Sequence, residues 1–263
     1  MRFEHPSLRH CLIRAWCPSL GASGLTLIDR SGRNAHGTLT NMAGQGNWQA
    51  SGSGVALNFD GADDYVACGA TLTDAFTYSA WCYLRTFGPN GKTIHGSLTN
   101  GNLYIPAFTS TLTFVQSDSA GQGKTFAGSI PLLKWSHFCV TRQSDNLVSV
   151  FIDGVRSTTA PQSVTGTFTL NSLGRYATNT TYLWDGFLDD IRIYDRALTL
   201  SEIRLLASRR GIGLSPLPDR AAGLPRKLFV NVGGTWRDGD AYVNTGSGWR
   251  LGVPFVNAGG TWK

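Results

Sequence analysis

The chain has 263 residues, of which only 15% are charged, and its 32 glycines suit many short strands joined by tight turns better than a helical bundle. All of the net charge of +6 lies in residues 204–263, where nine basic residues accompany three acidic ones without forming a polybasic run, so we expect no nucleic-acid-binding surface. The five cysteines include no C-x-x-C pair and no histidine at metal-ligand spacing, which argues against zinc and for free thiols in a reducing cytoplasm.

Residues 1–9 are polar and charged, and the apolar stretch that follows is interrupted by Arg14 and Pro18. Neither the apolar region of a signal peptide nor a membrane-spanning helix fits this pattern. We therefore expect a chain without a signal peptide and without membrane insertion, folded in the cytoplasm of the producing cell.

Residues 25–194 consist of short alternating runs broken by Gly, Asn and Asp, which is typical of an antiparallel sandwich. In residues 76–84, alternate side chains would share one buried face of a strand. Residues 147–156 contain Asp153-Gly154 between β-branched residues, and this pair favours a type I′ hairpin turn because both central positions need positive φ. The pattern predicts an all-β, two-sheet antiparallel sandwich.

One short helix is predicted at the end of this region. Thr199 and Glu202 have the spacing of a capping box, the apolar residues Ile203 and Leu206 follow, and Gly211 is a plausible stop. We place the first domain at residues 1–211 and a proline-containing linker at 212–227.

A repeat of period 13 occupies residues 228–263. An aromatic-Val-Asn start recurs at 229–231, 242–244 and 255–257, and each start is followed by a tryptophan and then a cation. Each unit predicts a small β-hairpin. Isolated hairpins are marginally stable, so we expect the repeats to form an assembly interface, the alternative being a β-meander on the flank of the sandwich. The predicted interface residues are Trp236, Trp249, Trp262, Arg237 and Arg250.

Five motifs in chain order resemble the LamG-like, concanavalin A-like lectin/glucanase jelly-roll family. They are residues 29–37 (DRSGRNAHG), 59–66 (FDGADDYV), 135–138 (WSHF), 151–154 (FIDG) and 188–198 (LDDIRIYDRAL). The resemblance implies a jelly roll that contacts glycans or proteins and in some members carries calcium. The C-terminal repeat resembles tails of bacteriophage structural proteins.

Catalysis is not expected. Glucanases of this fold need two carboxylates across a cleft, whereas the chain has only two glutamates, Glu4 and Glu202, which are far apart in the sequence. Asp189 and Asp190 are adjacent and would point to opposite faces of a strand. His137 lies in an alternating strand where packing is the simpler interpretation.

A calcium site is the most credible local chemistry, because Ca²⁺ prefers several hard oxygen ligands. Asp29 and Asn34 in one loop would meet Asp189 or Asp190 if the first and last strands pair. The alternative is that Asp29 and Asn34 stabilise a turn through bonds to the backbone.

Four aromatic residues lie in or beside stretches rich in Asn and Thr, where exposed rings would stack on sugars. They are Tyr104, Tyr176, Tyr182 and Trp184. The alternative for each is ordinary packing.

These patterns predict a non-catalytic structural or adhesion protein, displayed on the surface of a bacteriophage virion as a capsid decoration or tail protein. Its partners would be other virion proteins or its own subunits, through the repeats, and a cell-surface glycan. The alternatives are a bacterial surface carbohydrate-binding protein and a degenerate glycan-cleaving enzyme.

Overall fold

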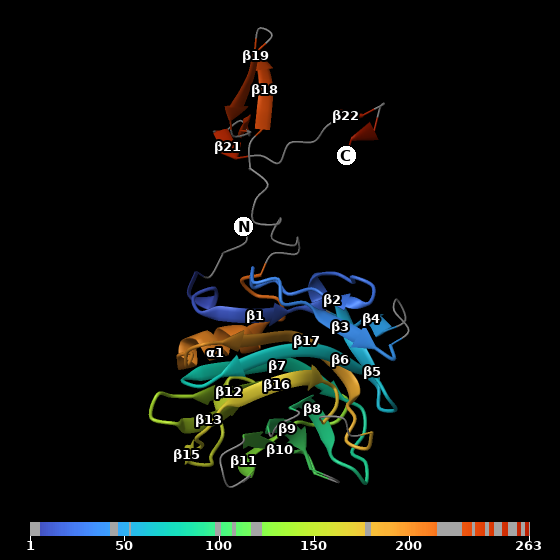
Figure 1. Ribbon diagram of the computed structural model, residues 1–263, viewed down its shortest axis with the longest axis vertical. Helices are drawn as coiled ribbons and strands as arrows, with labels where there is room; N and C mark the ends of the chain where they lie inside the picture. The colour runs from blue at the N-terminus through green and yellow to red at the C-terminus, as the bar shows by residue number, and fades with distance from the viewer. Residues whose placement is uncertain are drawn as a thin grey trace. The chain divides into compact units, whose positions relative to one another are not determined.

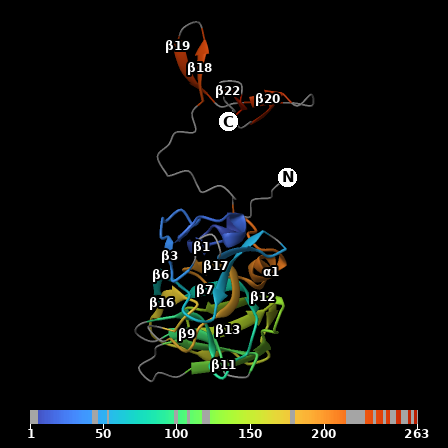
Figure 2. The ribbon, with the colours of Figure 1, turned by 90° about the vertical axis from the view of Figure 1, so that its right-hand side faces the viewer.

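A computed structural model of the chain (Figures 1 and 2) divides it into two units, Met1–Asp219 and Arg220–Lys263, which are described separately. The division lies inside the segment 212–227 that the sequence predicts as a linker. The residues that the structure describes are 6–42, 47–52, 54–97, 101–106, 109–116, 123–176, 180–214, 228–232, 235–239, 242–244, 249–251, 257–258 and 261–262.

Two antiparallel sheets form the first unit, which confirms the predicted sandwich. The nine-stranded sheet has the order β14-β13-β12-β7-β17-β5-β4, with β1 paired to β17 and β15 to β13. Its strands are β1 (Leu12–Trp16), β4 (Trp48–Ala50), β5 (Val55–Asp60), β7 (Phe76–Leu84), β12 (Trp135–Arg142), β13 (Leu147–Ile152), β14 (Val155–Arg156), β15 (Gln162–Ser163) and β17 (Asp185–Tyr194).

The eight-stranded sheet has the order β11-β10-β9-β8-β16-β6-β3-β2. Its strands are β2 (Thr26–Leu27), β3 (Gly37–Thr40), β6 (Tyr65–Leu72), β8 (Lys92–Gly96), β9 (Gly101–Ile105), β10 (Thr111–Gln116), β11 (Gly123–Ser129) and β16 (Phe168–Leu173). Two short 3-10 helices, η1 (Pro6–Leu8) and η2 (Pro18–Leu20), accompany β1.

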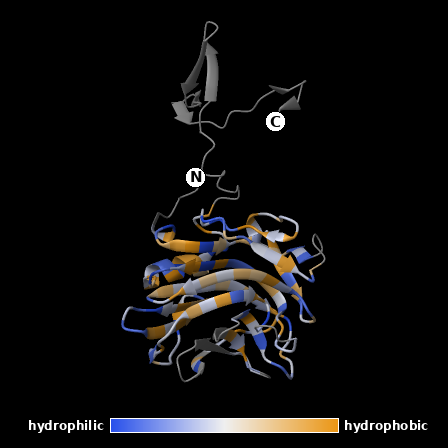
Figure 3. Ribbon diagram, in the orientation of Figure 1, coloured by the Kyte–Doolittle hydropathy of each residue, from blue (hydrophilic) through white to orange (hydrophobic). Residues whose placement is uncertain are grey.

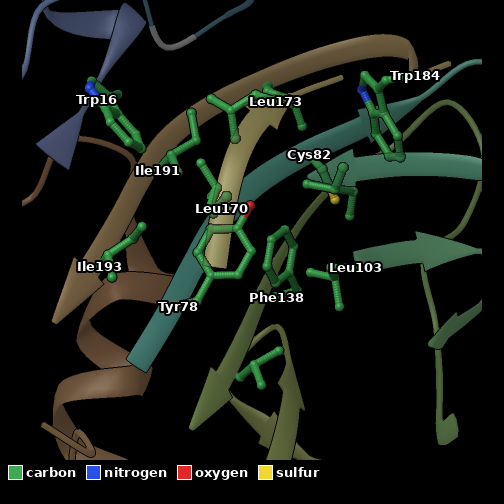
Figure 4. Packing of buried hydrophobic residues seen from close by; sticks show 14 of the residues in the cluster. Trp16, Tyr78, Cys82, Leu103, Phe138, Leu170, Leu173, Trp184, Ile191 and Ile193 are labelled. Atoms are coloured by element: carbon green, nitrogen blue, oxygen red, sulfur yellow. The ribbon is translucent and has the colours of Figure 1, made fainter. Parts of the chain in front are cut away.

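The main core lies between the two sheets and follows the two-residue period of the strands. In β7 the alternate residues Phe76, Tyr78 and Cys82 are fully buried in this core, and Figure 4 shows Tyr78 and Cys82 among their neighbours. Orange and paler or blue segments follow one another along the strands in Figure 3, as one buried face requires. The predicted turn also forms, with φ of 50° at Asp153 and 75° at Gly154, as a type I′ hairpin needs.

A second cluster covers the opposite face of the nine-stranded sheet. Phe138 and Val140 of β12 belong to the main core, whereas Cys139 between them packs into this second cluster with Leu206 of the helix α1 (Leu200–Ser208). The indole Nε1 of Trp81 donates a hydrogen bond to the Leu206 carbonyl at 3.2 Å. This part of the sheet is therefore buried on both faces.

The helix α1 begins with the predicted capping box. The backbone N–H of Glu202 donates to Thr199 Oγ1, and the backbone N–H of Thr199 donates to Glu202 Oε2 at 2.9 Å. Glu202 also pairs with Arg196 at 2.6 Å, and this pair together with the cap lowers the pKa of Glu202 to about 2. The carboxylate thus holds the start of the helix.

All five cysteines are free thiols, including Cys82 and Cys139, which the sequence predicts as free thiols of the core. Cys17, Cys82 and Cys139 are buried, and burial raises the pKa of each thiol well above its usual value. Within the residues that the structure describes, no helix combines the length and the apolar character needed to cross a membrane.

The described residues of the second unit form three antiparallel strand pairs, one for each repeat. Asn231 lies opposite Trp236 in the first, Asn244 opposite Trp249 in the second, and Asn257 opposite Trp262 in the third. The same register in all three follows from the period of 13. The strands are β18 (Leu228–Val232), β19 (Thr235–Gly239), β20 (Tyr242–Asn244), β21 (Trp249–Leu251), β22 (Asn257–Ala258) and β23 (Thr261–Trp262).

Candidate functional site: a tyrosine cluster on the eight-stranded sheet

Three of the four aromatic residues predicted to contact sugar lie together at one end of the eight-stranded sheet. We call Tyr104, Tyr176 and Tyr182 the tyrosine cluster. Tyr104 is on β9, Tyr176 follows β16, and Tyr182 lies in the connection to β17. The ring centroids of Tyr176 and Tyr182 are 6.2 Å apart, with an angle of 81° between the planes. Tyr182 is 39% exposed and the other two are half-buried, so the cluster reaches solvent.

The rings of Tyr104 and Tyr182 both lie close to the backbone of Gly91. A methyl carbon at Gly91 would lie 3.3 Å from Cδ2 of Tyr104 and 3.5 Å from Cδ1 of Tyr182. It would also lie 3.0 Å from the Ile105 carbonyl oxygen. Burial, and to a smaller extent the Tyr182 phenol, raise the pKa of Tyr104. The sequence gives no sign of this role for Gly91, because it depends on a connection more than 80 residues away.

The prediction for Trp184 is wrong, because the structure buries this side chain completely in the main core, beside Cys82 (Figure 4). The backbone N–H of Trp184 donates to the Gly174 carbonyl at 2.7 Å, which draws the residue toward the sheets. Strand periodicity carries the missed signal: Trp184 is four residues before Leu188, which also faces the main core.

Arg175 directly precedes Tyr176 of the cluster in the chain and was missed by the sequence prediction. Its guanidinium carbon is 3.3 Å from the ring centroid of Tyr65 on β6, a close cation–π stack. Its Nε is buried without a hydrogen-bond partner.

The Asp29 carboxylate accepts hydrogen bonds from the backbone around its own turn. This is the arrangement that the sequence offers as the alternative to calcium binding. Its Oδ1 accepts hydrogen bonds from the backbone N–H groups of Ala15 and Ser31, both at 2.9 Å. Its Oδ2 accepts from Ser31 Oγ at 2.8 Å and from the Ala35 N–H at 3.0 Å. Asn34 has φ of 56°, the left-handed conformation that a turn uses.

The four residues predicted to bind calcium do not form one donor set. β1 pairs with β17 as the prediction requires, but the carboxylates of Asp29, Asp189 and Asp190 do not converge. In the described part of the chain the acidic cluster that does converge is formed by Asp60 and its neighbours Asp63 and Asp64. Its oxygens already accept hydrogen bonds from nearby backbone N–H groups.

Asp189 and Asp190 contact the same buried segment, which corrects the expectation that they face opposite sides of a strand. Asp190 has φ of 48°, and the pairing of β7 with β17 shifts register between Asp189 and Arg192. We call this irregularity the 189–192 bulge. A β-bulge re-aims side chains in this way, and it puts both carboxylates against residues 210–211.

The 189–192 bulge holds the chain where it leaves α1. Arg192 donates to Asp190 from Nε at 2.7 Å and to the Ile212 carbonyl from Nη2 at 2.6 Å. The Gly211 N–H donates to Asp190 Oδ2 at 2.8 Å, and Arg210 pairs with Asp189 at 3.4 Å. Burial, and then the adjacent Asp190, raise the pKa of Asp189 to about 7. Residues 212 and 214 pack into the second cluster, so the first part of the predicted linker belongs to the sandwich.

His137 is a buried packing residue, as the sequence interpretation has it. Burial lowers the pKa of His137 to about 3, so the ring is neutral near pH 7. Its ring contacts Trp81 at a centroid distance of 5.5 Å. His95 of β8 is also fully buried, neither ring nitrogen has a partner, and burial lowers its pKa to about 3.

The predicted assembly residues lie at equivalent positions of the second unit. Trp236 and Arg237 are in β19, Trp249 and Arg250 are in β21, and Trp262 is in β23. Their side chains lie outside the described part of the structure. The sequence prediction of an interface therefore stays a prediction.

Comparison with known proteins places this geometry in a family context. The model of the concanavalin A-like lectin/glucanases superfamily matches residues 60–204. Domain 4 of AbnA, an extracellular arabinanase of Geobacillus stearothermophilus solved in complex with arabinotriose, matches at 18% identity with a TM-score of 0.57, over 74% of this chain and 98% of that chain. No curated protein sequence matches the chain.

Two further solved structures share the fold over a smaller part of their own length. A Trypanosoma rangeli sialidase mutant displaying trans-sialidase activity matches at 16% identity with a TM-score of 0.54, over 75% of this chain and 32% of that chain. A botulinum neurotoxin serotype D/C binding domain matches at 15% identity with a TM-score of 0.55, over 75% of this chain and 52% of that chain. At these identities the likeness concerns the fold alone.

Proposed function

Because the chain belongs to the concanavalin A-like lectin/glucanase superfamily, we propose that its sandwich binds a glycan, without cleaving it, at the tyrosine cluster. The gathering of Tyr104, Tyr176 and Tyr182 from three separate segments carries this proposal. Ring faces pack on the C–H groups of sugars, and phenolic hydroxyls bond to sugar hydroxyls. The arabinotriose complex of the arabinanase domain lends support from a protein of the same fold.

Binding without cleavage is favoured by the state of the acidic residues. A glycosidase needs one carboxyl group as acid and a second as base or nucleophile. Glu202 is committed to the cap of α1 and to Arg196, and Asp190 is committed to Arg192. Asp189 is fully buried and pairs with Arg210.

We further propose that the C-terminal unit attaches the sandwich to a larger assembly, and that this assembly is a bacteriophage particle. Three hairpins in one register would present three equivalent tryptophans to a partner. A gene position beside capsid or tail genes would support the virion role. A position beside cell-surface genes would favour the bacterial carbohydrate-binding protein instead.

A glycan array with the full chain tests the binding proposal, followed by calorimetry on the ligands it finds. Tyr182→Ala and Tyr104→Ala each remove a platform ring and should weaken binding about tenfold. Tyr83→Ala is the matched control, since Tyr83 is half-buried on the other sheet and contacts Trp135 and Phe187 instead. No bound glycan, or equal losses in all three variants, would refute the proposal.

A further inference from the structure

Most arginines of the sandwich already have an acidic or carbonyl partner. Arg85 pairs with Asp185 at 2.7 Å, and Arg196 pairs with Glu202 at 2.6 Å. Arg142 donates to the Gly166 carbonyl at 2.6 Å. These guanidinium groups are satisfied within the fold and have little to offer a ligand.

Arg175 differs from them. No described residue forms an ion pair with it, and its Nε is buried without a partner. Asp64 directly precedes the stacked Tyr65, and its carboxylate accepts hydrogen bonds from other donors, the Asp60 N–H and Asn47 Nδ2, both at 3.0 Å. The stack on Tyr65 orients the guanidinium plane and leaves its charge unneutralised.

The strand register puts Arg175 at the same level of the sheet as the tyrosine cluster. Leu173 of β16 pairs with His95 of β8, and the Gly174 N–H bonds to the Ile94 carbonyl, so Arg175 comes level with Thr93. On the other side of β8, Thr93 pairs with Tyr104. Two strand spacings separate them, so the backbones at Tyr104 and Arg175 are about 10 Å apart. The Arg175 guanidinium extends from this position toward Tyr65 of β6, on the side of β16 away from β8. Tyr176 and Tyr182, like Arg175, belong to the connection between β16 and β17.

We propose that the tyrosine cluster and Arg175 together bind a carboxylate-bearing sugar, such as a uronic acid residue of a glycan. The rings hold one sugar residue of the glycan by its C–H faces, and Arg175 binds the carboxylate of a neighbouring sugar residue through paired N–H groups. The planar guanidinium fork matches a carboxylate in this way, whereas a neutral sugar leaves the charge unpaired. This inference rests on the proposed function and names the ligand class of the same site.

The test uses the full chain with two probes that share one sugar backbone, an oligogalacturonate and its uncharged methyl ester, beside a panel of sialylated, sulfated and neutral glycans. We expect acidic sugars to be bound and their methyl esters to be bound at least about tenfold less tightly. Arg175→Gln should cause a similar loss for the acid and almost none for the ester. Added salt should weaken binding of the acid only.

Two further variants separate the role of the Arg175 guanidinium from the general effect of changing an arginine in the sandwich. Arg175→Lys keeps the charge but loses the planar fork, so it should bind the acid between the wild type and Arg175→Gln. Arg85→Gln is the matched control, because Arg85 also stacks on an aromatic ring, Phe187 at 4.9 Å, but is paired with Asp185. Thermal melting of each variant would confirm that the fold is retained.

The outcomes separate the two proposals. Neutral or sulfated glycans bound in preference to carboxylates, with a loss in Tyr182→Ala but none in Arg175→Gln, would overturn the acidic-sugar inference and leave glycan binding intact. Absence of binding to every glycan would overturn both. Equal losses in Arg175→Gln and Arg85→Gln would also overturn the inference, since the effect would then not be specific to the cluster.

Discussion

One added methyl group at Gly91 probes the tyrosine cluster without removing a ring. The new carbon would lie within 3.5 Å of both Tyr104 and Tyr182 and 3.0 Å from a backbone oxygen. We expect Gly91→Ala to displace the rings and to lower glycan affinity about tenfold, measured by calorimetry. Gly69→Ala is the control, because its nearest neighbour is a carbonyl oxygen at 4.0 Å. Equal affinities in the two variants would contradict the role of Gly91.

Two buried histidines predict a loss of stability in acid. His95 and His137 are neutral in the fold with pKa values of about 3, whereas an unfolded histidine titrates near 6.5. Above pH 6.5 neither state takes up a proton at these residues. Below pH 6.5 these histidines bind protons in the unfolded state but stay neutral in the folded state. The free energy of unfolding therefore falls by about 1.4 kcal/mol per pH unit for each histidine.

The histidine effect is isolated by substitution, because other groups titrate in the opposite direction. Burial raises the pKa of Asp64 to about 6 and that of Asp189 to about 7, so these residues bind protons first in the fold and add stability as the pH falls. Urea unfolding between pH 7 and pH 4 should therefore show a shallower acid loss in His95→Phe than in the wild type. A variant of the exposed His10 should keep the wild-type slope.

Asp29 is expected to stabilise the fold with or without calcium. Its carboxylate accepts four hydrogen bonds. Removing it in Asp29→Ala should lower the free energy of unfolding by about 2–4 kcal/mol, because backbone donors lose their acceptor. Thermal melts with added Ca²⁺ and with chelator measure this. A calcium-dependent rise in melting temperature that Asp29→Ala abolishes would restore the ligand interpretation.

Among the structural elements, those with a local cause could be predicted from the sequence. The alternation of residues 76–84, the Asp153-Gly154 turn and the capping box at Thr199 each depend on neighbours in the chain, and each forms as expected. The 189–192 bulge depends on the pairing of β17 with β7, which lies far away in the sequence. Period and propensity carry no information on such a contact, so the pattern predicted two opposed carboxylates.

At the 189–192 bulge we predict that one conservative substitution strongly lowers the free energy of unfolding. Asp190→Asn keeps the shape but leaves Arg192 as an uncompensated buried charge, which should cost about 3–5 kcal/mol of unfolding free energy. The matched control is Asp185→Asn, whose partner Arg85 is 30% exposed, and it should cost less than about 1 kcal/mol. Urea denaturation compares the two. Similar losses would mean that the bulge is not a buried electrostatic anchor.

At the scale of the whole molecule, we expect the first unit to keep its stability and glycan binding when the second unit is removed. A chain that ends at Asp219 keeps the residues 210–214 that the bulge and the second cluster hold. It should melt within a few degrees of the full chain and bind glycan with the same single-site affinity, but lose oligomerisation. Light scattering with size-exclusion chromatography gives the result. A full chain that is itself monomeric, or a truncated chain that aggregates, would contradict this division.

The organisation of the molecule was also predictable only in part. The repeat period of 13 predicted the three hairpins, because each repeat carries its own turn and strands. The end of the first domain was placed too early, at residue 211. The contacts of Ile212 and Leu214 with the second cluster are long-range and leave no local pattern.

The three buried thiols lie in different layers of the sandwich, so the opening of each layer can be measured separately. Cys82 lies between the sheets, Cys139 lies between the nine-stranded sheet and α1, and Cys17 lies beside the 189–192 bulge. A thiol reagent reacts with each only when its own layer opens. With the half-buried Cys11 and Cys68 replaced, the order in which the remaining sulfurs are labelled would show whether the sandwich opens first at its helix-covered face, at the exit of the chain or through its centre.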